Sequence, residues 1–600
     1  MKTLPYETII CVDLRPFNPT QPDYGVGDYI HMLGFKPDVI VFLNFFVDFV
    51  HRHELIDDMQ LGRMTVGQRG TPSDYSWTKQ NLAELIRCMK EAGISPFLGI
   101  LSSTSSDVWK DVHIDWEFKE ILQTKRGDQL VWGSAINPLK RFKDGTYYED
   151  FFARDLLKVL CDYQFDGYVA GDGMLGLRGP RETLLDTDFS EDMTDQFASF
   201  HGLKLPEFTN YDLRAAYIVE HYFAEWVQFY VQRWGQHVGK ITSMLHTQGK
   251  SMMAIDAWSR NPEELITAFG IDYRVLHQQG LKAVFVQARE TNKWRKHREG
   301  EYVREENSVY TFLTHKAYEP GIRYYWAEAT INLPEFWNSV LDLPHVLERE
   351  TYGYLWTMNW REGVFSKAVD GICVIWGNDL TEEQWRWLVQ RWSMAFEQIS
   401  SFKAPAGLTL LWNELGINQL TSQNKIFGYR FAKLLDLGLC IQSIVHADQL
   451  GTKGMENWLQ SYTDQQMVTF DRTLIEQFPD LADRMFIVHE DYIEYGGFRY
   501  SWQEGVELMK RTCGLRTSRG RVLGFENKDG ALVLSLENPE NLFYEHIELK
   551  VPFEIGSGDI KVLPPREWFA IPESTEGQST KISVAPDAST QVVVQRSKQS

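Results

Sequence analysis

The chain alternates short apolar runs with longer stretches of helical periodicity from residue 7 to about residue 400. This alternation is typical of βα units and predicts an α/β fold with a parallel sheet rather than a sandwich. Eight apolar runs have the length and composition of strands: residues 8–13, 39–44, 96–101, 167–172, 251–256, 283–287, 323–328 and 371–376. Helical patterns at residues 81–92, 147–163 and 211–247 lie between them. The order predicts a (β/α)8 TIM barrel.

The pattern changes past residue 400. Strand patterns at 407–411, 440–446 and 466–470 alternate with helical patterns at 426–437 and 455–461, which predicts a small open α/β unit. Short strands beginning near residues 531, 546, 560 and 591, separated by turn residues, predict a terminal β-sandwich. We therefore predict three domains: a catalytic barrel over residues 1–402, a small α/β domain over 403–515 and a β-sandwich over 516–600.

Polar side chains recur at or just beyond the carboxyl ends of the predicted barrel strands. Four of them are carboxylates: Asp13, Asp172, Asp256 and Glu328. The carboxyl ends of barrel strands meet at one rim, where barrel enzymes hold their active sites, so we predict these four as catalytic residues. An isolated buried carboxylate is costly, although a carboxylate here can also cap the next helix.

Asp172 is the most informative of these carboxylates. It ends an apolar run and stands between Gly171 and Gly173. Because glycine lacks a side chain, we expect the two glycines to let a substrate ring approach the backbone closely.

Composition narrows the range of partners. The chain of 600 residues has 82 Asp and Glu against 61 Lys and Arg, a net charge of −21, and no basic stripe, which disfavours nucleic acid and anionic membranes. No apolar leader or stretch of transmembrane length is found, so we expect a cytoplasmic protein. Its six cysteines are scattered and no nucleotide or zinc motif occurs, so we expect no cofactor. His51 and His53 beside Glu54 lack a third metal ligand at a recognisable spacing, and no metal is expected.

Aromatic residues are abundant, with 20 Trp and 26 Tyr. Aromatic faces in a cleft suit ligands that combine apolar rings with hydroxyl groups, as sugars do. Trp258, Trp326, Trp360 and Trp376 lie at or near predicted strand ends and are candidate stacking faces. The predicted substrate-binding residues are Arg15, Asn44, Trp258, Gln287, Arg289, Glu290, Trp326, Asn359 and Trp376. Arg289 either binds substrate bidentately or pairs with Glu290.

Several segments resemble barrel glycoside hydrolases. The run Phe-Asp-Gly-Tyr-Val-Ala-Gly-Asp at residues 165–172 resembles their fourth-strand signature. Residues 132–142 resemble a cleft insertion, 251–258 a fifth strand and 323–328 a seventh strand ending in a carboxylate. The order of barrel, small α/β domain and β-sandwich resembles that of family 42 β-galactosidases. The resemblance implies a glycoside hydrolase that cleaves oligosaccharides with paired carboxylates.

The roles of the carboxylates stay open. The largest clan of such barrels places Asn-Glu on strand four, whereas this chain has Gly171-Asp172. Families with a strand-four aspartate nucleophile place the acid on a later strand, which implies Asp256, Glu290 or Glu328. Inverting sialidase-like exoglycosidases use a first-strand aspartate, which Asp13 matches. A carboxylate separation of about 5 Å implies retention and roughly 6.5–9.5 Å inversion.

Two further readings compete with a glycosidase. A non-catalytic carbohydrate-binding barrel would keep the aromatic cleft, but it would tolerate amides at the strand ends. A metal-dependent barrel enzyme would need histidines there, and the predicted strand ends have none. Because most soluble oligomers are symmetric dimers, a homodimer is the expected assembly.

Overall fold

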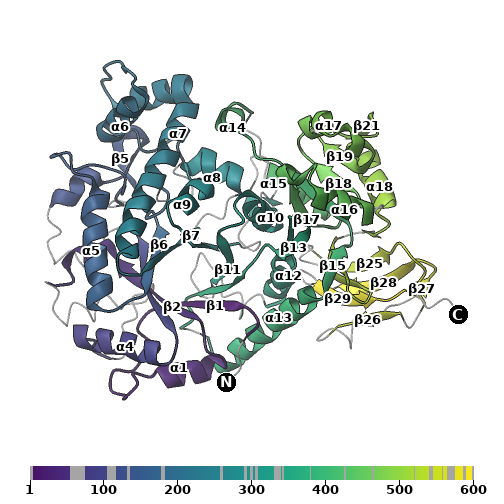
Figure 1. Ribbon diagram of the computed structural model, residues 1–600, viewed down its shortest axis with the longest axis horizontal. Coiled ribbons are helices and arrows are strands. Elements are labelled where there is room, and N and C mark those ends of the chain that lie inside the picture. Colours follow the sequence, from purple (N-terminus) through teal and green to yellow (C-terminus); the bar gives the residue numbers. More distant parts are fainter. Residues whose placement is uncertain are drawn as a thin grey trace.

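A closed barrel of eight parallel strands forms the amino-terminal part of the protein (Figure 1). The computed structural model describes residues 4–54, 75–103, 116–131, 135–177, 183–256, 261–288, 294–296, 302–304, 308–329, 340, 344–378, 380–423, 427–461, 465–518, 520–538, 545–556, 559–563, 575–584 and 589–596. The barrel strands are β1 (Glu7–Val12), β2 (Val39–Phe46), β3 (Ser95–Ser102), β6 (Gly167–Asp172), β7 (Ser251–Asp256), β8 (Ala283–Val286), β11 (Arg323–Ala329) and β14 (Gly371–Ile375). They follow one another around the ring in chain order, and β14 pairs with β1 to close it. The predicted TIM barrel and all eight predicted strands are confirmed.

The barrel strands are apolar on both faces because both faces are buried. Alternate residues fill the interior, among them Ile9, Val41, Phe285 and Cys373. The other residues pack against the surrounding helices, which include α1 (Val26–Leu33), α2 (Val47–Arg52), α4 (Lys79–Glu91), α5 (Tyr148–Asp162), α6 (Glu191–His201), α7 (Tyr211–His246), α8 (Pro262–Phe269), α9 (Tyr273–Gln278), α10 (Ser308–Tyr318), α12 (Pro344–Leu355) and α13 (Glu382–Ser400). The helices predicted at 81–92, 147–163 and 211–247 correspond to α4, α5 and α7.

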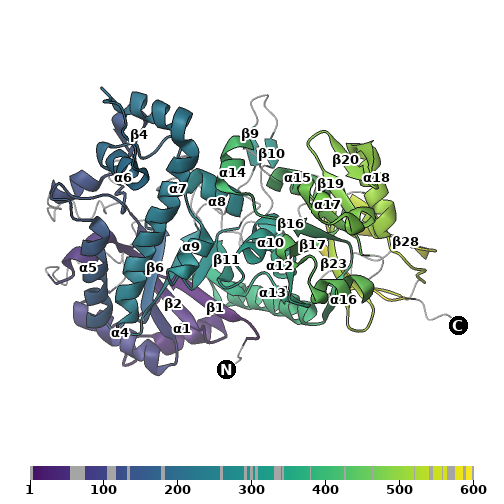
Figure 2. The same cartoon turned by 45° about the horizontal axis from the view of Figure 1, so that its top comes forward.

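A second sheet of eight strands lies beside the barrel (Figure 2). Its order is β13 (Val364–Lys367), β12 (Met358–Arg361), β17 (Ile441–His446), β16 (Leu408–Trp412), β18 (Met467–Thr469), β19 (Met485–Val488), β20 (Tyr492–Tyr495) and β21 (Phe498–Ser501). The hairpin β12–β13 comes from the stretch predicted to be barrel alone. It joins this sheet through parallel pairing of β12 with β17, so the second sheet begins some forty residues before residue 402.

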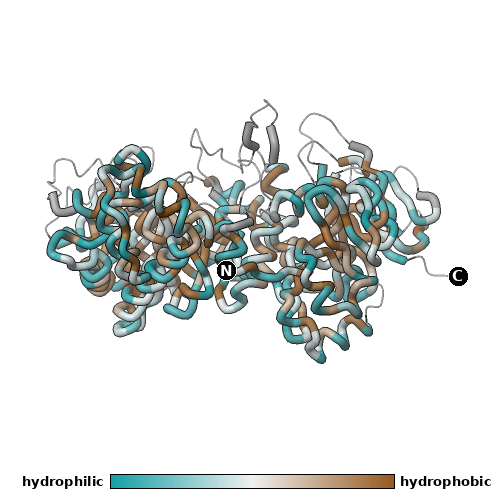
Figure 3. The backbone as a smooth tube through the Cα atoms, turned by 90° about the horizontal axis from the view of Figure 1, so that it is seen from above, coloured by the Kyte–Doolittle hydropathy of each residue, from teal (hydrophilic) through white to brown (hydrophobic). Residues whose placement is uncertain are grey.

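Two further sheets pack face to face at the carboxyl end. One has the order β15 (Phe402–Pro405), β23 (Arg521–Asn527), β24 (Leu532–Glu537), β29 (Ser589–Val594), β26 (Ile560–Val562), and the other β22 (Arg516–Thr517), β25 (Glu545–Lys550), β28 (Ser579–Val584), β27 (Thr575–Glu576). Side chains of both sheets, such as Val522, Leu534, Ile547 and Ile582, share one apolar core. Figure 3 shows that hydrophobic residues are concentrated in the inner parts of both ends of the elongated molecule. In the described residues, no helix combines the length and apolarity needed to cross a membrane.

The second sheet meets the barrel through polar contacts at the carboxyl end of β16. Arg274 of α9 binds both carboxylate oxygens of Glu414, which also contacts His446. Although burial raises the pKa of Glu414, the hydrogen bonds from His446 and Arg274 outweigh it and lower the pKa to about 2.

Glu263 of α8 forms a second contact between the barrel and the sheet. The Trp412 indole Nε1–H donates to Glu263 Oε1 at 2.8 Å, and the Tyr310 hydroxyl donates to the same oxygen at 3.2 Å. The side chain is buried, and burial raises the pKa of Glu263 above its ordinary value. Its neutral form is therefore the one that this interface favours.

We expect Glu263→Gln to stabilise the protein progressively as the pH rises. A raised native pKa gives stability that is complete below the unfolded pKa of about 4.3 and is lost as the pH rises through the native pKa. Wild type and variant should therefore melt at similar temperatures at pH 4, and the variant should melt higher at pH 8. Glu264→Gln, on the same turn and partly exposed, is the control. The same difference in melting temperature between wild type and Glu263→Gln at pH 4 and at pH 8 would contradict the interpretation.

Candidate active site

The carboxyl rim of the barrel holds the four predicted carboxylates. Asp13 directly follows β1, Asp172 ends β6, Asp256 ends β7, and Glu328 is the penultimate residue of β11. All eight strands run parallel in a closed ring, so these residues lie on one rim.

The four side chains divide between the two faces of the barrel wall, because successive residues of a strand point to opposite faces. Asp13 lies two residues beyond Cys11, whose side chain is in the barrel interior. Each of the other three lies two residues beyond a residue that packs against the helices. These preceding residues are Ala170, Ala254 and Trp326. Asp13 therefore faces the barrel axis, whereas Asp172, Asp256 and Glu328 occupy outward positions at the rim.

Asp172 is the only one of the four that is partly exposed. The exposed fractions of the other three residues are 2% for Asp13, 7% for Asp256 and 0% for Glu328. The backbone of Asp172 is fixed, since its carbonyl accepts a hydrogen bond from Ser103 N at 2.8 Å. Asp172 is therefore the carboxylate best placed to reach a ligand.

The fold itself requires both glycines beside Asp172, and the approach of a substrate to them stays a prediction. A Cβ on Gly171 would lie 2.3 Å from the Ile100 carbonyl oxygen, so the neighbouring strand β3 requires glycine there. Gly173 has φ of 77°, in the left-handed region that favours glycine, and turns the chain away from the strand.

Asp256 contacts the helices behind the barrel wall. One carboxylate oxygen lies 3.8 Å from Nε2 of His315 on α10, and Tyr273 on α9 faces the same carboxylate. Burial, followed by the nearby Asp256 charge, raises the pKa of Tyr273 well above its ordinary value. These contacts hold Asp256 against the helices.

Asp13 and Arg15, both predicted from sequence, lie together. The Asp13 carboxylate accepts hydrogen bonds from Arg15 N and Arg15 Nε, each at 2.8 Å, and from Asn378 Nδ2 at 3.4 Å. Gln287 directly follows β8, two residues beyond the interior residue Phe285, and is partly exposed.

Trp376 caps the barrel interior just beyond β14. Its side chain packs with the interior cluster, and its φ of 67° is unusual for a residue with a bulky side chain. Such backbone costs about 1–3 kcal/mol and is concentrated at ligand sites. Trp376 therefore stays a candidate for contact with a ligand at the rim.

Three residues predicted to contact a ligand have other surroundings in the structure. Trp326 is fully buried between barrel and helices, where its Nε1–H donates to the Ala288 carbonyl at 3.1 Å. Asn359 lies in β12 of the second sheet, and Trp360 beside it packs on Trp458. The residues Trp258, Arg289 and Glu290 lie outside the described residues, as does the side chain of Asn44.

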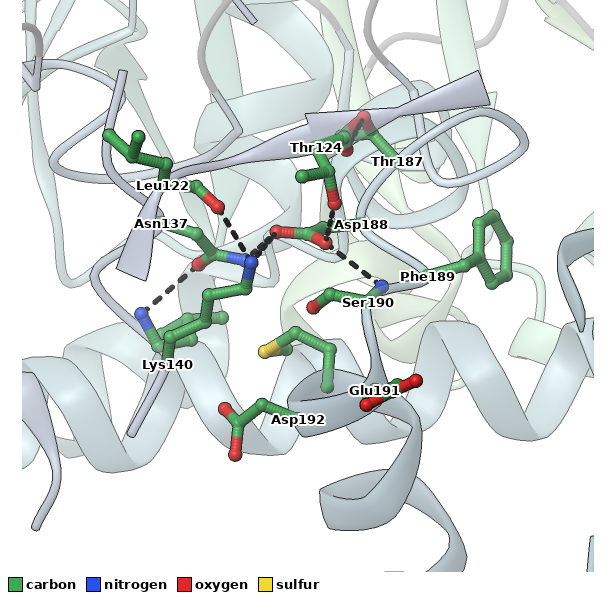
Figure 4. A network of polar contacts seen from close by, with 12 residues as sticks. Leu122, Thr124, Asn137, Lys140, Thr187, Asp188, Phe189, Ser190, Glu191 and Asp192 are labelled. Carbon is green, nitrogen blue, oxygen red and sulfur yellow. Dashed lines mark hydrogen bonds and ion pairs between the residues drawn. The ribbon is translucent and has the colours of Figure 1, made fainter. Parts of the chain in front are cut away.

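A buried polar network that the sequence did not reveal supports the loops of the rim (Figure 4). Asp188 is fully buried, and its carboxylate accepts hydrogen bonds from Thr124 Oγ1 at 2.8 Å and Asn137 Nδ2 at 3.1 Å. Lys140 Nζ lies 3.1 Å from the same carboxylate and also donates to the Leu122 carbonyl. The network joins described residues between β3 and α5 to Asp188, which follows β6 in the chain. Asn137 and Lys140 fall in the segment that resembles a cleft insertion.

One group of side chains has the spacing of a metal site. His53, Glu54 and Asp162 place ligand atoms within 4.8 Å of one another. However, the ammonium of Lys158 lies 2.6 Å from Glu54, and His53 Nε2 lies 2.8 Å from Asp162. His51 instead bonds Asp155 and Tyr148. These histidines and carboxylates are thus engaged in pairs with other side chains.

No protein-family model and no curated protein sequence matches the chain. Among solved structures it is similar to α-L-fucosidase isoenzyme 2 from Paenibacillus thiaminolyticus, at 10% identity and a TM-score of 0.49 over 99% of this chain and 100% of that one. It is also similar to β-galactosidase from the psychrophilic Marinomonas ef1, at 9% identity and a TM-score of 0.48 over 98% and 100%. The PgaB (BpsB) glycoside hydrolase domain from Bordetella bronchiseptica aligns at 14% identity and 0.40 over 66% and 100%. At these identities and TM-scores, the similarities alone assign no reaction or substrate to this chain.

We expect Asp188→Asn to lower the free energy of unfolding by about 3 kcal/mol, because it leaves the Lys140 ammonium buried without its counter-ion. Denaturant unfolding measures this. The control is Asp186→Asn, which breaks a surface pair with Arg126 and should cost at most about 1 kcal/mol. An equal decrease in the free energy of unfolding in both variants would show that the buried ion pair contributes no more to stability than the surface pair.

Proposed function

We propose that this protein is a glycoside hydrolase that cleaves oligosaccharides at the carboxyl rim of its barrel. The observation that supports this most is the gathering of four carboxylates on one rim, with Asp172 partly exposed. Glycosidic bond cleavage needs two carboxyl groups, one protonated and one ionised. In this proposal Asp172 is one of the two, and another carboxyl group of the rim is the second.

In this proposal Asp172 acts as the ionised carboxylate, because it alone among the four is partly exposed to solvent. The acid comes from Asp256, Glu328 or Glu290. Trp376 and Gln287 contribute contacts to the sugar, since both stand at the interior mouth of the barrel. A panel of aryl glycosides, including sialosides, tests the reaction class; binding of sugars without turnover would make the barrel a carbohydrate-binding protein.

An inverting exoglycosidase that uses Asp13 is the second candidate. One observation favours it: Asp13 is the only one of the four on the interior face, and Arg15 and Asn378 orient its carboxylate. This candidate requires inversion at the anomeric carbon of the released sugar, so a retained configuration would exclude it.

We expect Asp172→Asn to lower kcat by about two orders of magnitude or more, since an amide neither attacks an anomeric carbon nor activates water. Glu328→Gln should act similarly if Glu328 is the acid. Both variants should melt within a few degrees of wild type. In the smaller variant Asp172→Gly, added azide or formate should restore turnover by occupying the place of the missing carboxylate.

Asp13→Asn and Asp256→Asn complete the comparison. If Asp172→Asn turns over like wild type while Asp13→Asn is inactive, the role assigned to Asp172 is wrong and the second candidate stands.

A further inference from the structure

A separate pocket of about 810 Å³ opens on the opposite side of the barrel from the carboxyl rim. Lys316 and Asp370 line it, and both belong to the amino ends of barrel strands: Lys316 Nζ donates to the carbonyl of Ile322, just before β11, and Asp370 directly precedes β14. The hairpin β12–β13, the strand β15 and the turn after β23 form its other walls, near the end of α13. The pocket thus lies where the barrel, the second sheet and the sandwich meet, and such junctions often hold ligands.

The charge of this pocket is opposite to that of the chain. Five of its lining residues are basic and one is acidic, whereas acidic residues outnumber basic ones in the whole chain by 82 to 61. The basic residues are Lys316, Arg361, Lys367, Lys403 and Lys528.

Three of these cations already have carboxylate partners. Lys316 Nζ lies 3.0 Å from the Asp370 carboxylate. Arg361 pairs with Asp448 at 3.3 Å, and Lys403 pairs with Glu526. Within each pair the two charges cancel, so the three pairs add no net charge to the pocket.

The other two cations, Lys367 and Lys528, form no ion pair within 4 Å with a carboxylate of the described residues, although the charge of Asp370 also acts on Lys367. Lys528 Nζ donates to the carbonyl of Ser400 at 3.1 Å, at the carboxyl end of α13. Lys367 Nζ lies 4.8 Å from the centre of the Phe396 ring. Burial lowers the pKa of Lys367, so its environment disfavours the charged form. The ring face compensates only part of that cost, because a cation–π contact contributes about 0.5–2 kcal/mol.

Aromatic side chains form one wall of the same pocket. Phe365 stands two residues before Lys367 on β13, so both side chains share one face of the strand. Phe365 packs against Phe402 and Trp458, with ring centres 5.0 Å and 5.8 Å apart. Lys367, Lys528 and this apolar wall therefore all line the same pocket.

We propose that this pocket binds a small dianion of the phosphate monoester class whose organic part rests on the aromatic wall. The excess of basic over acidic lining residues favours an anion, and Lys367 and Lys528, which form no ion pair within 4 Å in the described residues, supply the two charges that match a phosphate monoester near neutral pH. The site is independent of the proposed glycosidase activity, because it lies at the other end of the barrel.

Titration calorimetry of the full chain with phenyl phosphate and with inorganic phosphate tests the proposal. We expect one site per chain, with phenyl phosphate bound more tightly than inorganic phosphate because only the former reaches the aromatic wall. In the double variant Lys367→Met, Lys528→Met, which keeps the apolar stems, the Kd should rise by about tenfold or more. Added phenyl phosphate should also raise the melting temperature of wild type above that in sodium chloride of equal ionic strength.

Lys433→Met is the matched control, because Lys433 Nζ also lies over an aromatic ring, that of Trp502 at 4.0 Å, but outside the pocket. Its affinity for phenyl phosphate should equal that of wild type. Absence of binding to wild type, or an equal Kd in the double variant whose melting shows it to be folded, would overturn the proposal. Equal affinity for inorganic and phenyl phosphate would contradict the proposed contact between the ligand and the aromatic wall.

Discussion

Closure of the parallel barrel is the constraint on which the arrangement of this protein depends. The pairing of β14 with β1 joins the first and last strands across more than 350 residues, and it leaves no free edge. Because every strand runs in the same direction, residues far apart in sequence, such as Asp13 and Glu328, end on one rim. The proposed chemistry follows from this geometry rather than from any local motif.

The loops above the rim depend on a second feature, the buried Asp188 carboxylate. It holds together described segments that follow β3 and β6 in the chain. On the other side, Arg274 and Glu263 fasten the second sheet to α8 and α9. The rim is therefore supported by charged and polar contacts on two sides, whereas the barrel below it is apolar.

Sequence patterns predicted the barrel well because its strands are buried on both faces and read as continuous apolar runs. The same property hid the direction of each side chain. Trp326 and Trp376 look alike in sequence, yet strand alternation turns Trp326 to the helices, while Trp376 packs inside the barrel. The hairpin β12–β13 escaped prediction as part of the second sheet because its partner strand β17 lies about eighty residues further on. The Asp188 network escaped for a similar reason, since it joins three separate segments.

The proposed glycosidase activity requires that the carboxyl rim bind and cleave a sugar. A crystal structure of Asp172→Asn with the glycoside that the wild type turns over tests it most directly. The sugar ring should lie at the rim, with its anomeric carbon next to residue 172. A sugar bound elsewhere, with no ring within reach of residue 172, would contradict it.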